Sequence, residues 1–378
     1  MGFRLVISLA VIAISQWAWA TPARPYEDQD SFFKTNANSR QIKIMSYNAL
    51  NLYDSQHDDG FVDYTYLPQG HPKKQNCSEL GKTHYRELCE QLDWTNPKLQ
   101  RKIEQLGKVI LGHGQRPDLL ALQEVENERV IKKLADHVGY KDYIVTNFKN
   151  RRGVDMALLY DTRNLEFVAK YIVESKGRDM LRVHFKSKRS GANLFVYVNH
   201  WAAQLGPTRL RVEAAKALRE DISYLNDNYS NPSIVALGDF NTTFDEEAEV
   251  FDNHVLSQQG KFKMVEAHQE SRRRYPQFNK HFPDGSYWRG RDNWQRFDRI
   301  FLSQNLLKTS NSIRADLESY RIVYSTMITG EYTFSEDPEN ESSQQITVRY
   351  PLRYNFMENP NYPLGYSDHL PVTLLLNL

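Results

Sequence analysis

Short apolar runs with the spacing of strands dominate the chain, and helical patterns occur singly between groups of them. The segment "QIKIMSYNAL" alternates between polar and apolar residues and then turns apolar, as a strand of a sheet does. Nine further runs have the length and the flanking turn residues of strands. The ten predicted strands fall at residues 41–50, 117–127, 140–148, 154–161, 165–173, 180–187, 193–201, 233–240, 296–303 and 370–378.

Helix signals are fewer than strand signals. Residues 96–114 place Pro97 at the first helical position, repeat apolar residues on one face and end in glycines. Similar patterns predict helices at 127–139 and at about 207–224. Because strands outnumber helices and the helices come singly between strand clusters, we expect an α/β (α+β) architecture of two packed sheets flanked by helices. No internal repeat interrupts the pattern, so we expect residues 41–378 to form a single domain.

The first twenty residues differ from the rest of the chain. Arg4 precedes the apolar run "LVISLAVIAISQWAWA", which closes on Ala18-Trp19-Ala20, the small-x-small pattern that signal peptidase accepts. The apolar core is shorter than the roughly 20 residues of a membrane-spanning helix. We therefore expect a signal peptide over 1–20 and a polar segment over 21–40. The predicted location is secreted or periplasmic, with no stable membrane association after cleavage.

A turn-rich insertion is expected at about 51–96, and it contains the only two cysteines, Cys77 and Cys89. In an exported chain, an isolated pair within one polar segment predicts a disulfide that closes a short loop. Loops this long without regular structure are uncommon and usually functional, so we expect the insertion to be ordered. The stretch "HDDGFVD" at 57–63 could hold a structural Ca²⁺, but its spacing fits no defined calcium loop and is more typical of a solvated turn.

Charge is balanced over the chain, with 48 Lys and Arg against 47 Asp and Glu. Removing residues 1–20 takes away Arg4 alone and leaves 47 of each sign. A polyanionic partner must therefore be attracted by local basic patches and not by a field of the whole molecule. Four basic stretches are candidates, although each is also typical of a solvated surface: 149–152, 186–189, 272–274 and 288–296.

Polar residues with metal-binding or proton-transfer chemistry stand at or near the ends of five predicted strands. Each one alone is explained by turn formation or core packing, but together they predict convergence on one cleft. Carboxylate and amide oxygens favour Mg²⁺, with Mn²⁺ or Ca²⁺ as alternatives, and the acid, base and amide groups beside them suit hydrolysis of a phosphate ester. The set is Asn48, Glu124, His200, Asp239 with Asn241, and Asp368 with His369, while Asp298 lies inside "RFDRIF".

The motifs around these residues resemble a known family. The ordered set "SYNALN", "LLALQEVEN", "VNHWAAQLG", "LGDFNTTF", "RFDRIFLS" and "YSDHLPV" is similar to the endonuclease/exonuclease/phosphatase superfamily, which includes pancreatic-type deoxyribonuclease, abasic-site endonucleases and neutral sphingomyelinases. The resemblance runs from about Lys43 to the C-terminus. It implies a four-layer αββα sandwich, in which two mostly antiparallel sheets lie face to face with helices outside.

The resemblance also implies roles for the polar residues. Asn48 and Glu124 match metal-binding positions, and Asp368 lies close to the same ion. Asp239 matches the carboxylate that orients or deprotonates the attacking water. Asn241 matches the amide that holds an oxygen of the substrate phosphate.

Two histidines have implied roles as well. His369 matches the histidine bound to the scissile phosphate, and Asp298 matches its carboxylate partner, which fixes the tautomer and favours the charged form. His200 matches a second histidine of the deoxyribonuclease branch, a candidate proton donor to the leaving oxygen. Arg178 resembles a contact to the substrate backbone in that branch. Asp155 could be a partner for His200, but its strand pattern favours an ordinary strand residue.

The predicted function is a monomeric, metal-dependent nuclease for DNA, with RNA as an alternative substrate and little sequence specificity. Arginines beside Tyr275, Trp288 and Trp294 would pair with phosphates and stack on bases. The alternative is a phosphodiesterase for lipid head groups such as sphingomyelin, which predicts an exposed apolar hairpin. A binding protein without catalysis would have lost one of the polar positions, and none is missing. "SYNALN" lacks the acidic residue after the Asn that abasic-site enzymes carry, which argues against a repair role.

Overall fold

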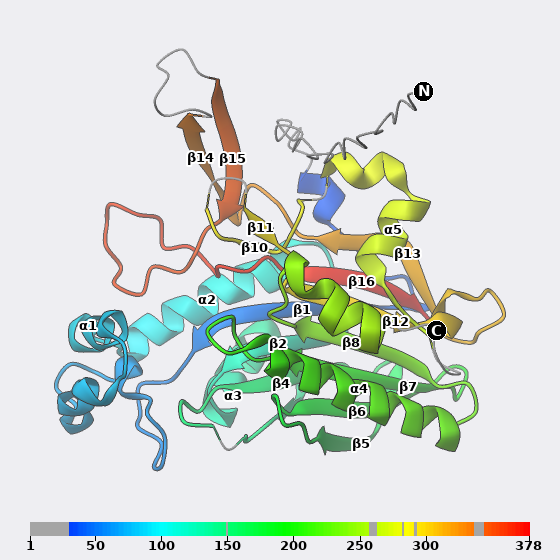
Figure 1. Ribbon diagram of the computed structural model, residues 1–378, viewed down its shortest axis with the longest axis horizontal. Helices are drawn as coiled ribbons and strands as arrows, with labels where there is room; N and C mark the ends of the chain where they lie inside the picture. The colour runs from blue at the N-terminus through cyan, green and yellow to red at the C-terminus, as the bar shows by residue number, and fades with distance from the viewer. Residues whose placement is uncertain (1–29, 149, 257–262, 282, 291–292, 336–343) are drawn as a thin grey trace, which may run out of the picture.

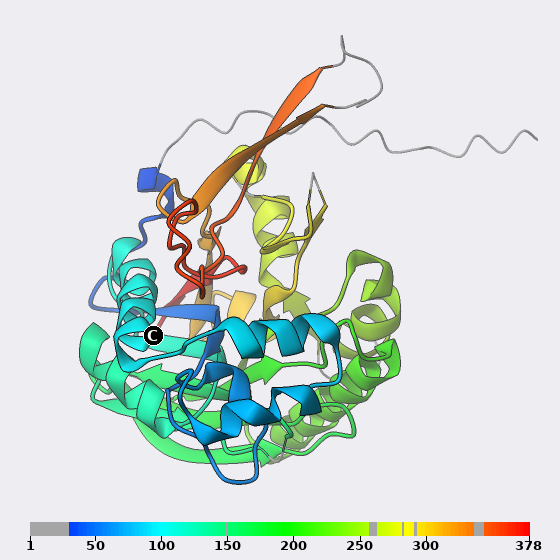
Figure 2. The ribbon, with the colours of Figure 1, turned by 90° about the vertical axis from the view of Figure 1, so that its left-hand side faces the viewer.

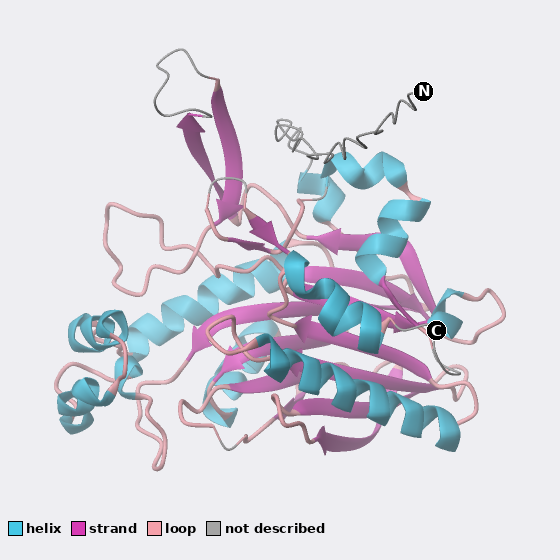
Figure 3. Ribbon diagram, in the orientation of Figure 1, coloured by secondary structure: helices cyan, strands magenta, loops and turns pink. Residues whose placement is uncertain are grey.

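Two six-stranded sheets lie face to face at the centre of the computed structural model (Figure 1, Figure 3). Within the sheets, neighbouring strands are antiparallel except for the parallel pairs β1–β2 and β7–β8. The first sheet has the order β13 (Arg314–Ile322), β16 (Val372–Asn377), β1 (Gln41–Leu52), β2 (Leu119–Val125), β4 (Asp155–Tyr160), β3 (Asp142–Val145). The second has the order β5 (Leu165–Val173), β6 (Met180–Ser187), β7 (Asn193–His200), β8 (Ser233–Asp239), β12 (Asp298–Ser303), β9 (Met264–Glu266).

The structure describes residues 30–148, 150–256, 263–281, 283–290, 293–335 and 344–378. The predicted signal peptide and the start of the polar segment after it lie outside these ranges. Within them, no helix is both long enough and apolar enough to cross a bilayer.

Helices cover the outer faces of both sheets and complete four layers, so the predicted fold class is confirmed (Figure 2). α2 (Asn96–Gly112) and α3 (Glu128–Val138) lie on the side of the first sheet, and α4 (Thr208–Asn228) lies on the side of the second. Two shorter helices are α1 (Thr83–Gln91) and α5 (Ala267–Arg274). A π-helical segment spans Ala248–Val255, and 3₁₀ segments span Asp30–Phe33, Tyr64–Tyr66, Pro72–Glu79, Phe244–Glu246, Pro276–His281 and Gln304–Leu307.

The alternation of side chains along β7 and β8 explains how the second sheet packs on both of its faces. In β7, Leu194, Val196 and Val198 point into the core between the sheets. Phe195 and Tyr197 point the other way, into a second core that the apolar face of α4 completes. Because successive side chains of a strand face opposite sides, an unbroken apolar run serves both cores. β8 repeats this division.

Two small hairpins and one long strand were not expected from the apolar pattern. β10 (Tyr287–Trp288) pairs with β11 (Trp294–Gln295), and β14 (Thr329–Ser335) pairs with β15 (Gln345–Pro351) to form an arm that stands out from the body (Figure 1). β13 adds an edge to the first sheet by pairing with β16. All of these elements fall between the two last predicted strands or beside them.

The insertion after β1 is ordered, as predicted. Cys77 and Cys89 form a disulfide, which confirms the predicted pairing. Their side chains pack with Tyr64 and Leu67 in a small core of their own. The Lys74 ammonium is buried beneath them and donates to three backbone carbonyls, at 3.0, 2.7 and 2.6 Å. Together these contacts give the insertion a fixed shape.

The two parallel strand pairs position the polar residues of the site. A parallel pair requires a crossover connection, and here α2 lies between β1 and β2 while α4 lies between β7 and β8. Parallel pairing brings the carboxyl ends of both strands to one edge. Asn48 accordingly pairs with Gln123 next to Glu124, and His200 pairs with Asp239. The antiparallel strand β12 begins at the same edge, where Asp298 pairs with Asp239.

Candidate active site

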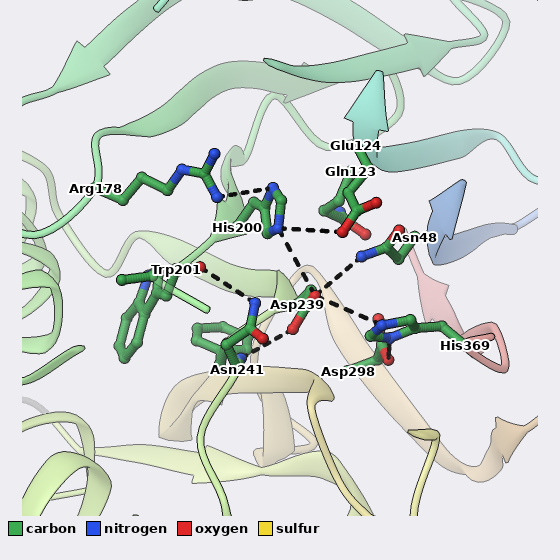
Figure 4. A network of polar contacts seen from close by, with 12 residues as sticks. Asn48, Gln123, Glu124, Arg178, His200, Trp201, Asp239, Asn241, Asp298 and His369 are labelled. Atoms are coloured by element: carbon green, nitrogen blue, oxygen red, sulfur yellow. Dashed lines mark hydrogen bonds and ion pairs between the residues drawn. The ribbon is translucent and has the colours of Figure 1, made fainter. Parts of the chain in front are cut away.

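Irregular backbone at the end of β2 aims Glu124 away from the sheet. Glu124 has a φ of 58°, and the pairing of β2 shifts register on both sides at this point. Such bulges re-aim side chains beside functional sites. The backbone NH of Asn51, also in the left-handed region at 56°, donates to Glu124 Oε2 at 3.0 Å. The carboxylate is therefore held over the edge of the sheet, with Oε1 directed toward His200 (Figure 4).

Gly238 explains the close approach of β7 and β8 just before Asp239. Its φ is 142°, and a Cβ atom at this position would lie 2.0 Å from the carbonyl oxygen of Asn199. Only glycine fits there without moving the neighbouring strand. The "GDFN" motif therefore has a packing reason as well as a chemical one.

Asp239 is buried between the two sheets with both carboxylate oxygens held. Asn48 on the opposite sheet donates its Nδ2 to Oδ2 at 3.0 Å, and the backbone NH of Asn241 donates to Oδ1 at 2.9 Å (Figure 4). Burial raises the pKa of Asp239, although the charge of His369 opposes this shift. A carboxylate with a raised pKa that is fixed in orientation is suited to accept a proton at neutral pH.

His369 is held as a charged imidazolium. Its Nδ1 donates to Asp298 Oδ2 at 2.7 Å, and Ser286 Oγ donates to the same oxygen at 2.7 Å. Burial disfavours the charge on His369, but the negative charges of Asp298 and Asp239 outweigh burial and raise its pKa. The other ring nitrogen, Nε2, lies 3.9 Å from Asp239 Oδ2. The ring therefore presents an N–H with positive charge to the space above Asp239.

His200 faces the same carboxylate from the other side, but as a neutral ring. Burial, with the charges of Arg178, His369 and Arg152, lowers its pKa well below the usual value. Arg178 Nη1 lies 3.3 Å from His200 Nδ1, and because a guanidinium can only donate, Nδ1 must be the acceptor. The hydrogen of the ring is then on Nε2, which lies 3.9 Å from Asp239 Oδ2 and from Glu124 Oε1.

Asn241 follows Asp239 in a left-handed conformation with a φ of 47°. Its Nδ2 donates to the carbonyl oxygen of Trp201 at 3.2 Å, and its own carbonyl oxygen accepts from Gln204. An amide nitrogen carries two hydrogens, so one remains for the cleft that Asn241 lines. Asn241 and Asp239 thus line the same cleft from positions two residues apart at the end of β8.

These side chains border one cleft of about 430 Å³. Predicted site residues in its lining are Glu124, His200, Asp239, Asn241, Asp368 and His369. Asn48, Asp298 and Arg178 stand behind this lining and contact it through Asp239, His369 and His200 respectively. The structure therefore brings all of the sequence-predicted residues together, and their individual roles stay predictions.

The donor set fits a hard divalent cation. Glu124 and Asp368 offer carboxylate oxygens at the cleft, and the burial of negative charge in Asp239 beside Asp298 and Glu124 is a repulsion that a cation would relieve. Across the described part of the chain, no group of three or more His, Cys, Asp and Glu side chains forms a ready-made metal site. This arrangement suits Mg²⁺, which proteins hold through one or two carboxylates together with water and substrate phosphates.

Of the basic stretches singled out in the sequence, two contribute to the cleft. Arg152 and Arg289 line it. Residues 186–189 lie at the opposite end of β6 from His200. Arg296 is buried and donates to Glu266 at 2.7 Å, so it is not available to a substrate.

The aromatic residues beside these arginines are also mostly engaged. Trp294 is 8% exposed and offers little surface to a base. Tyr275 stacks on Phe278, and Trp288 stacks on Tyr350. Asp155 is the first residue of β4 and accepts a hydrogen bond from the Thr146 hydroxyl, just after β3, at 2.7 Å. This agrees with the prediction of an ordinary strand residue.

Sequence reasoning missed residues that support the site from the β10 hairpin. Ser286 bonds to Asp298, and the ring of Tyr287 lies 4.8 Å from that of His369. The local sequence does not mark either residue as part of a site, because a serine and a tyrosine after "PDG" are typical of a turn. Arg353 was missed too; it lies 3.8 Å from Asp368.

Comparisons with known proteins agree with this fold. Among solved structures, the chain is similar to a mannosyl-6-phosphatase from Bacteroides thetaiotaomicron, with 16% identity over 89% of this chain and 100% of that one and a TM-score of 0.50. The human Nocturnin catalytic domain has 16% identity over 89% and 94%, with a TM-score of 0.48. Truncated Caenorhabditis elegans TDP2 has 12% identity over 89% of this chain and 98% of that one, with a TM-score of 0.48. At 16% identity, the similarity to the mannosyl-6-phosphatase shows a shared fold and nothing about activity. No curated protein matches the chain.

A family model gives the assignment. The model described as "Endonuclease/Exonuclease/phosphatase family" matches residues 84–378. The match begins within the insertion, later than the resemblance at Lys43, and does not reach Asn48. Because it spans well over half of the sequence, the chain belongs to the Endonuclease/Exonuclease/phosphatase family.

Proposed function

We propose that this protein is an exported, divalent-metal-dependent nuclease that cleaves phosphodiester bonds of DNA, and of RNA as a second substrate, with little sequence specificity. Members of its family are hydrolases that act on phosphate esters. The observation that carries the proposal is that Asp239 lies between His200 and His369. Its Oδ2 lies 3.9 Å from Nε2 of both His200 and His369, so one carboxylate and two N–H groups border a space that a phosphate can occupy.

Asp239 activates the attacking water in this proposal. Its two oxygens are fixed by Asn48 and Asn241, so the carboxylate keeps one orientation. Its raised pKa brings its proton affinity toward that needed at neutral pH, where a general base is most effective. The proton of the water passes to this carboxylate as the water oxygen attacks phosphorus.

The two histidines have different tasks because their charges differ. His369, charged through Asp298, donates from Nε2 to an oxygen of the phosphate and stabilises the negative charge that develops there. His200, neutral and fixed in one tautomer by Arg178, donates its Nε2–H toward the leaving oxygen. Asn241 holds a further phosphate oxygen with its free amide hydrogen.

Glu124 and Asp368, with Asn48 beside them, would hold the divalent cation. A bound cation supplies positive charge to the phosphate and to the leaving oxygen. We place the protein outside the cytoplasm, in agreement with the signal pattern at 1–20 and with a disulfide, which is typical of oxidising compartments.

In its described residues, the β14–β15 arm offers little of the apolar hairpin surface that the lipid alternative predicts. The β14–β15 arm stands out from the body, but Tyr332 is the one large apolar side chain of its described residues that is exposed, at 41%. The sequence that joins the two strands, "EDPENESS" at 336–343, carries four acidic residues. Insertion into the apolar part of a bilayer needs an apolar or aromatic tip.

Parallel assays on three substrates test the proposal. Supercoiled plasmid DNA, RNA and sphingomyelin vesicles are each incubated with the full chain, once with Mg²⁺ and once with a chelator. We expect cleavage of plasmid and of RNA in Mg²⁺ alone, and intact sphingomyelin. Hydrolysis of sphingomyelin with plasmid left intact would replace the proposal with the lipid alternative.

A further inference from the structure

The cleft has two unlike walls. One wall carries the polar residues described above. The other is formed by the insertion, which contributes Val62, Leu80, Tyr85 and Leu88. Tyr85 and Leu88 are three residues apart on α1 and therefore share one face of the helix. An apolar surface of the insertion thus lines the same cleft as the carboxylate and histidines that are proposed to act on a phosphate.

The apolar wall is held rigidly in place. The disulfide joins the 3₁₀ segment Pro72–Glu79 to α1, and Lys74 donates to three backbone carbonyls of the insertion. The insertion is also tied to the loop after β3. The backbone NH of Val62 donates to the carbonyl of Arg151 at 2.8 Å, and the Arg151 side chain donates to the carbonyl of Glu79 at 3.0 Å. A wall fixed on both sides can select what lies beside the phosphate.

The wall fits a flat, partly polar ring better than a hydrocarbon chain. Tyr85 is 38% exposed while its ring lies 4.0 Å from that of His84, so part of the ring remains accessible for stacking, and Arg152 and Thr65 add polar groups to the same lining. A nucleobase offers a flat face for Tyr85 and polar edges for these groups, whereas an acyl chain can satisfy neither Arg152 nor Thr65. The volume of about 430 Å³ is in the range of small-molecule sites, roughly 300–1,000 Å³.

We propose that the insertion wall is a nucleobase subsite, which makes an unpaired nucleotide in a single strand or at a frayed end the preferred substrate. This inference rests on the proposed nuclease function. In a duplex the bases are stacked and paired inside the helix, and a base must leave that stack, at a cost in free energy, to reach a side pocket. A single strand bears less of this cost.

Two strands that differ only in their bases test the subsite. An oligothymidylate and an abasic strand of equal length share the same sugar-phosphate backbone. The Tyr85→Ala/Leu88→Ala variant is compared with the wild type on both, and Tyr224→Ala is the matched control because Tyr224 is an exposed tyrosine on α4 (55%). Stacking of one base on an aromatic side chain contributes about 1–3 kcal/mol to binding, and about 1.4 kcal/mol corresponds to a tenfold change in affinity.

We expect the double variant to raise KM for the oligothymidylate about tenfold and to leave KM for the abasic strand unchanged, although the loss of Leu88 from its packing against the core should lower the urea unfolding midpoint. The wild type should also cleave the oligothymidylate faster than the same strand annealed to its complement. Equal effects on both strands, or none on either, would overturn the subsite while leaving the nuclease function standing. An effect confined to sphingomyelin hydrolysis would assign the wall to lipid instead. If the wild type cleaves neither strand, the proposed function itself is contradicted, and the subsite with it.

Discussion

Asp239 connects the two sheets through its hydrogen bonds and its charge. Asn48 of the first sheet and the backbone NH of Asn241 in the loop after β8 hold its carboxylate. It faces two histidines, of which His200 is neutral and His369 is positively charged. The difference between the histidines comes from their partners, since His369 bonds to a carboxylate and His200 to a guanidinium. Two rings of the same kind thereby acquire different chemistry from residues behind them.

Asp298 is the most direct test of this difference. Asp298→Asn removes the negative charge that favours the charged form of His369, so we expect its pKa to fall and kcat on DNA to fall about a hundredfold or more. Steady-state cleavage assays and NMR titration of the His369 ring measure the two effects. Asp136→Asn on the surface of α3 is a matched control. A wild-type kcat together with a lowered histidine pKa would show that the charge on His369 is not needed.

Glu246 gives a pH dependence of the stability of the fold. Burial acts to raise its pKa, but hydrogen bonds from Arg211, Thr208 and Gln204 outweigh burial and lower the pKa to about 2. A lowered pKa stabilises the fold above the unfolded value of about 4.5, and this stability is lost as the pH falls through that value toward about 2.

Glu246→Gln should therefore lower the free energy of unfolding at pH 7 by roughly 1–3 kcal/mol. Between pH 5 and about 2, the stability difference between wild type and variant should shrink. Urea titrations at several pH values measure it. A difference that stays constant with pH would contradict the assigned ion pair.

At this scale, the sequence predicted the polar residues that stand in short motifs after apolar runs and missed residues that act through contacts distant along the chain. Asp239, Asn241 and His369 stand in short motifs after apolar runs, so their convergence could be inferred. Ser286 and Tyr85 belong to turn-rich segments without periodicity, and their contacts arise from residues distant along the chain. No local pattern encodes such contacts.

Among the elements, the buried strands β7 and β8 and the largely exposed edge strand β5 were predicted, whereas β13, β14 and β15 were missed. β7 and β8 have apolar side chains on both faces and stand out as continuous runs. β13 has the sequence "RADLESYRI", and β14 and β15 form a polar arm, so the hydrophobic pattern that marks a strand is weak in all three. Tertiary pairing, and not the local sequence, makes them strands.

The insertion is the element whose stability depends on a covalent bond. Its own core is small, and the disulfide closes a loop between residues 12 apart in the sequence. We expect Cys77→Ser/Cys89→Ser to lower the free energy of unfolding by about 2–4 kcal/mol. Urea unfolding of the wild type with and without reductant should give the same difference as the variant. Equal stability in all three samples would show that the packing of the insertion suffices without the bond.

At the scale of the whole molecule, the four-layer fold gathers residues that lie far apart in the sequence. Both parallel pairs end at one edge, β12 begins there, and the segment before β16 reaches it through the pairing of His369 with Tyr287. The face-to-face packing of two sheets then closes the site, since Asn48 and Asp239 belong to different sheets. The fold class could be predicted from the order of helices and strands along the sequence. The contact between Asn48 and Asp239 depends instead on which strands are neighbours within each sheet, and the sequence does not give that order directly.

Dependence on a divalent cation is a property of the assembled cleft. We expect a chelator to abolish nuclease activity and added Mg²⁺ to restore it in full, because Glu124 and Asp368 keep their positions on the folded scaffold. Glu124→Gln should raise the Mg²⁺ concentration needed for half-maximal activity by about tenfold or more. Activity measured against Mg²⁺ concentration gives this value. An unchanged requirement would remove Glu124 from the cation site.

Cleavage of supercoiled plasmid DNA by the Asp239→Asn variant tests the central claim most directly. The amide keeps the size of the side chain but cannot accept the proton of the attacking water. The account predicts that the rate falls at least about a thousandfold in Mg²⁺ while circular dichroism shows an intact fold. Cleavage at the wild-type rate by the folded variant would contradict the account.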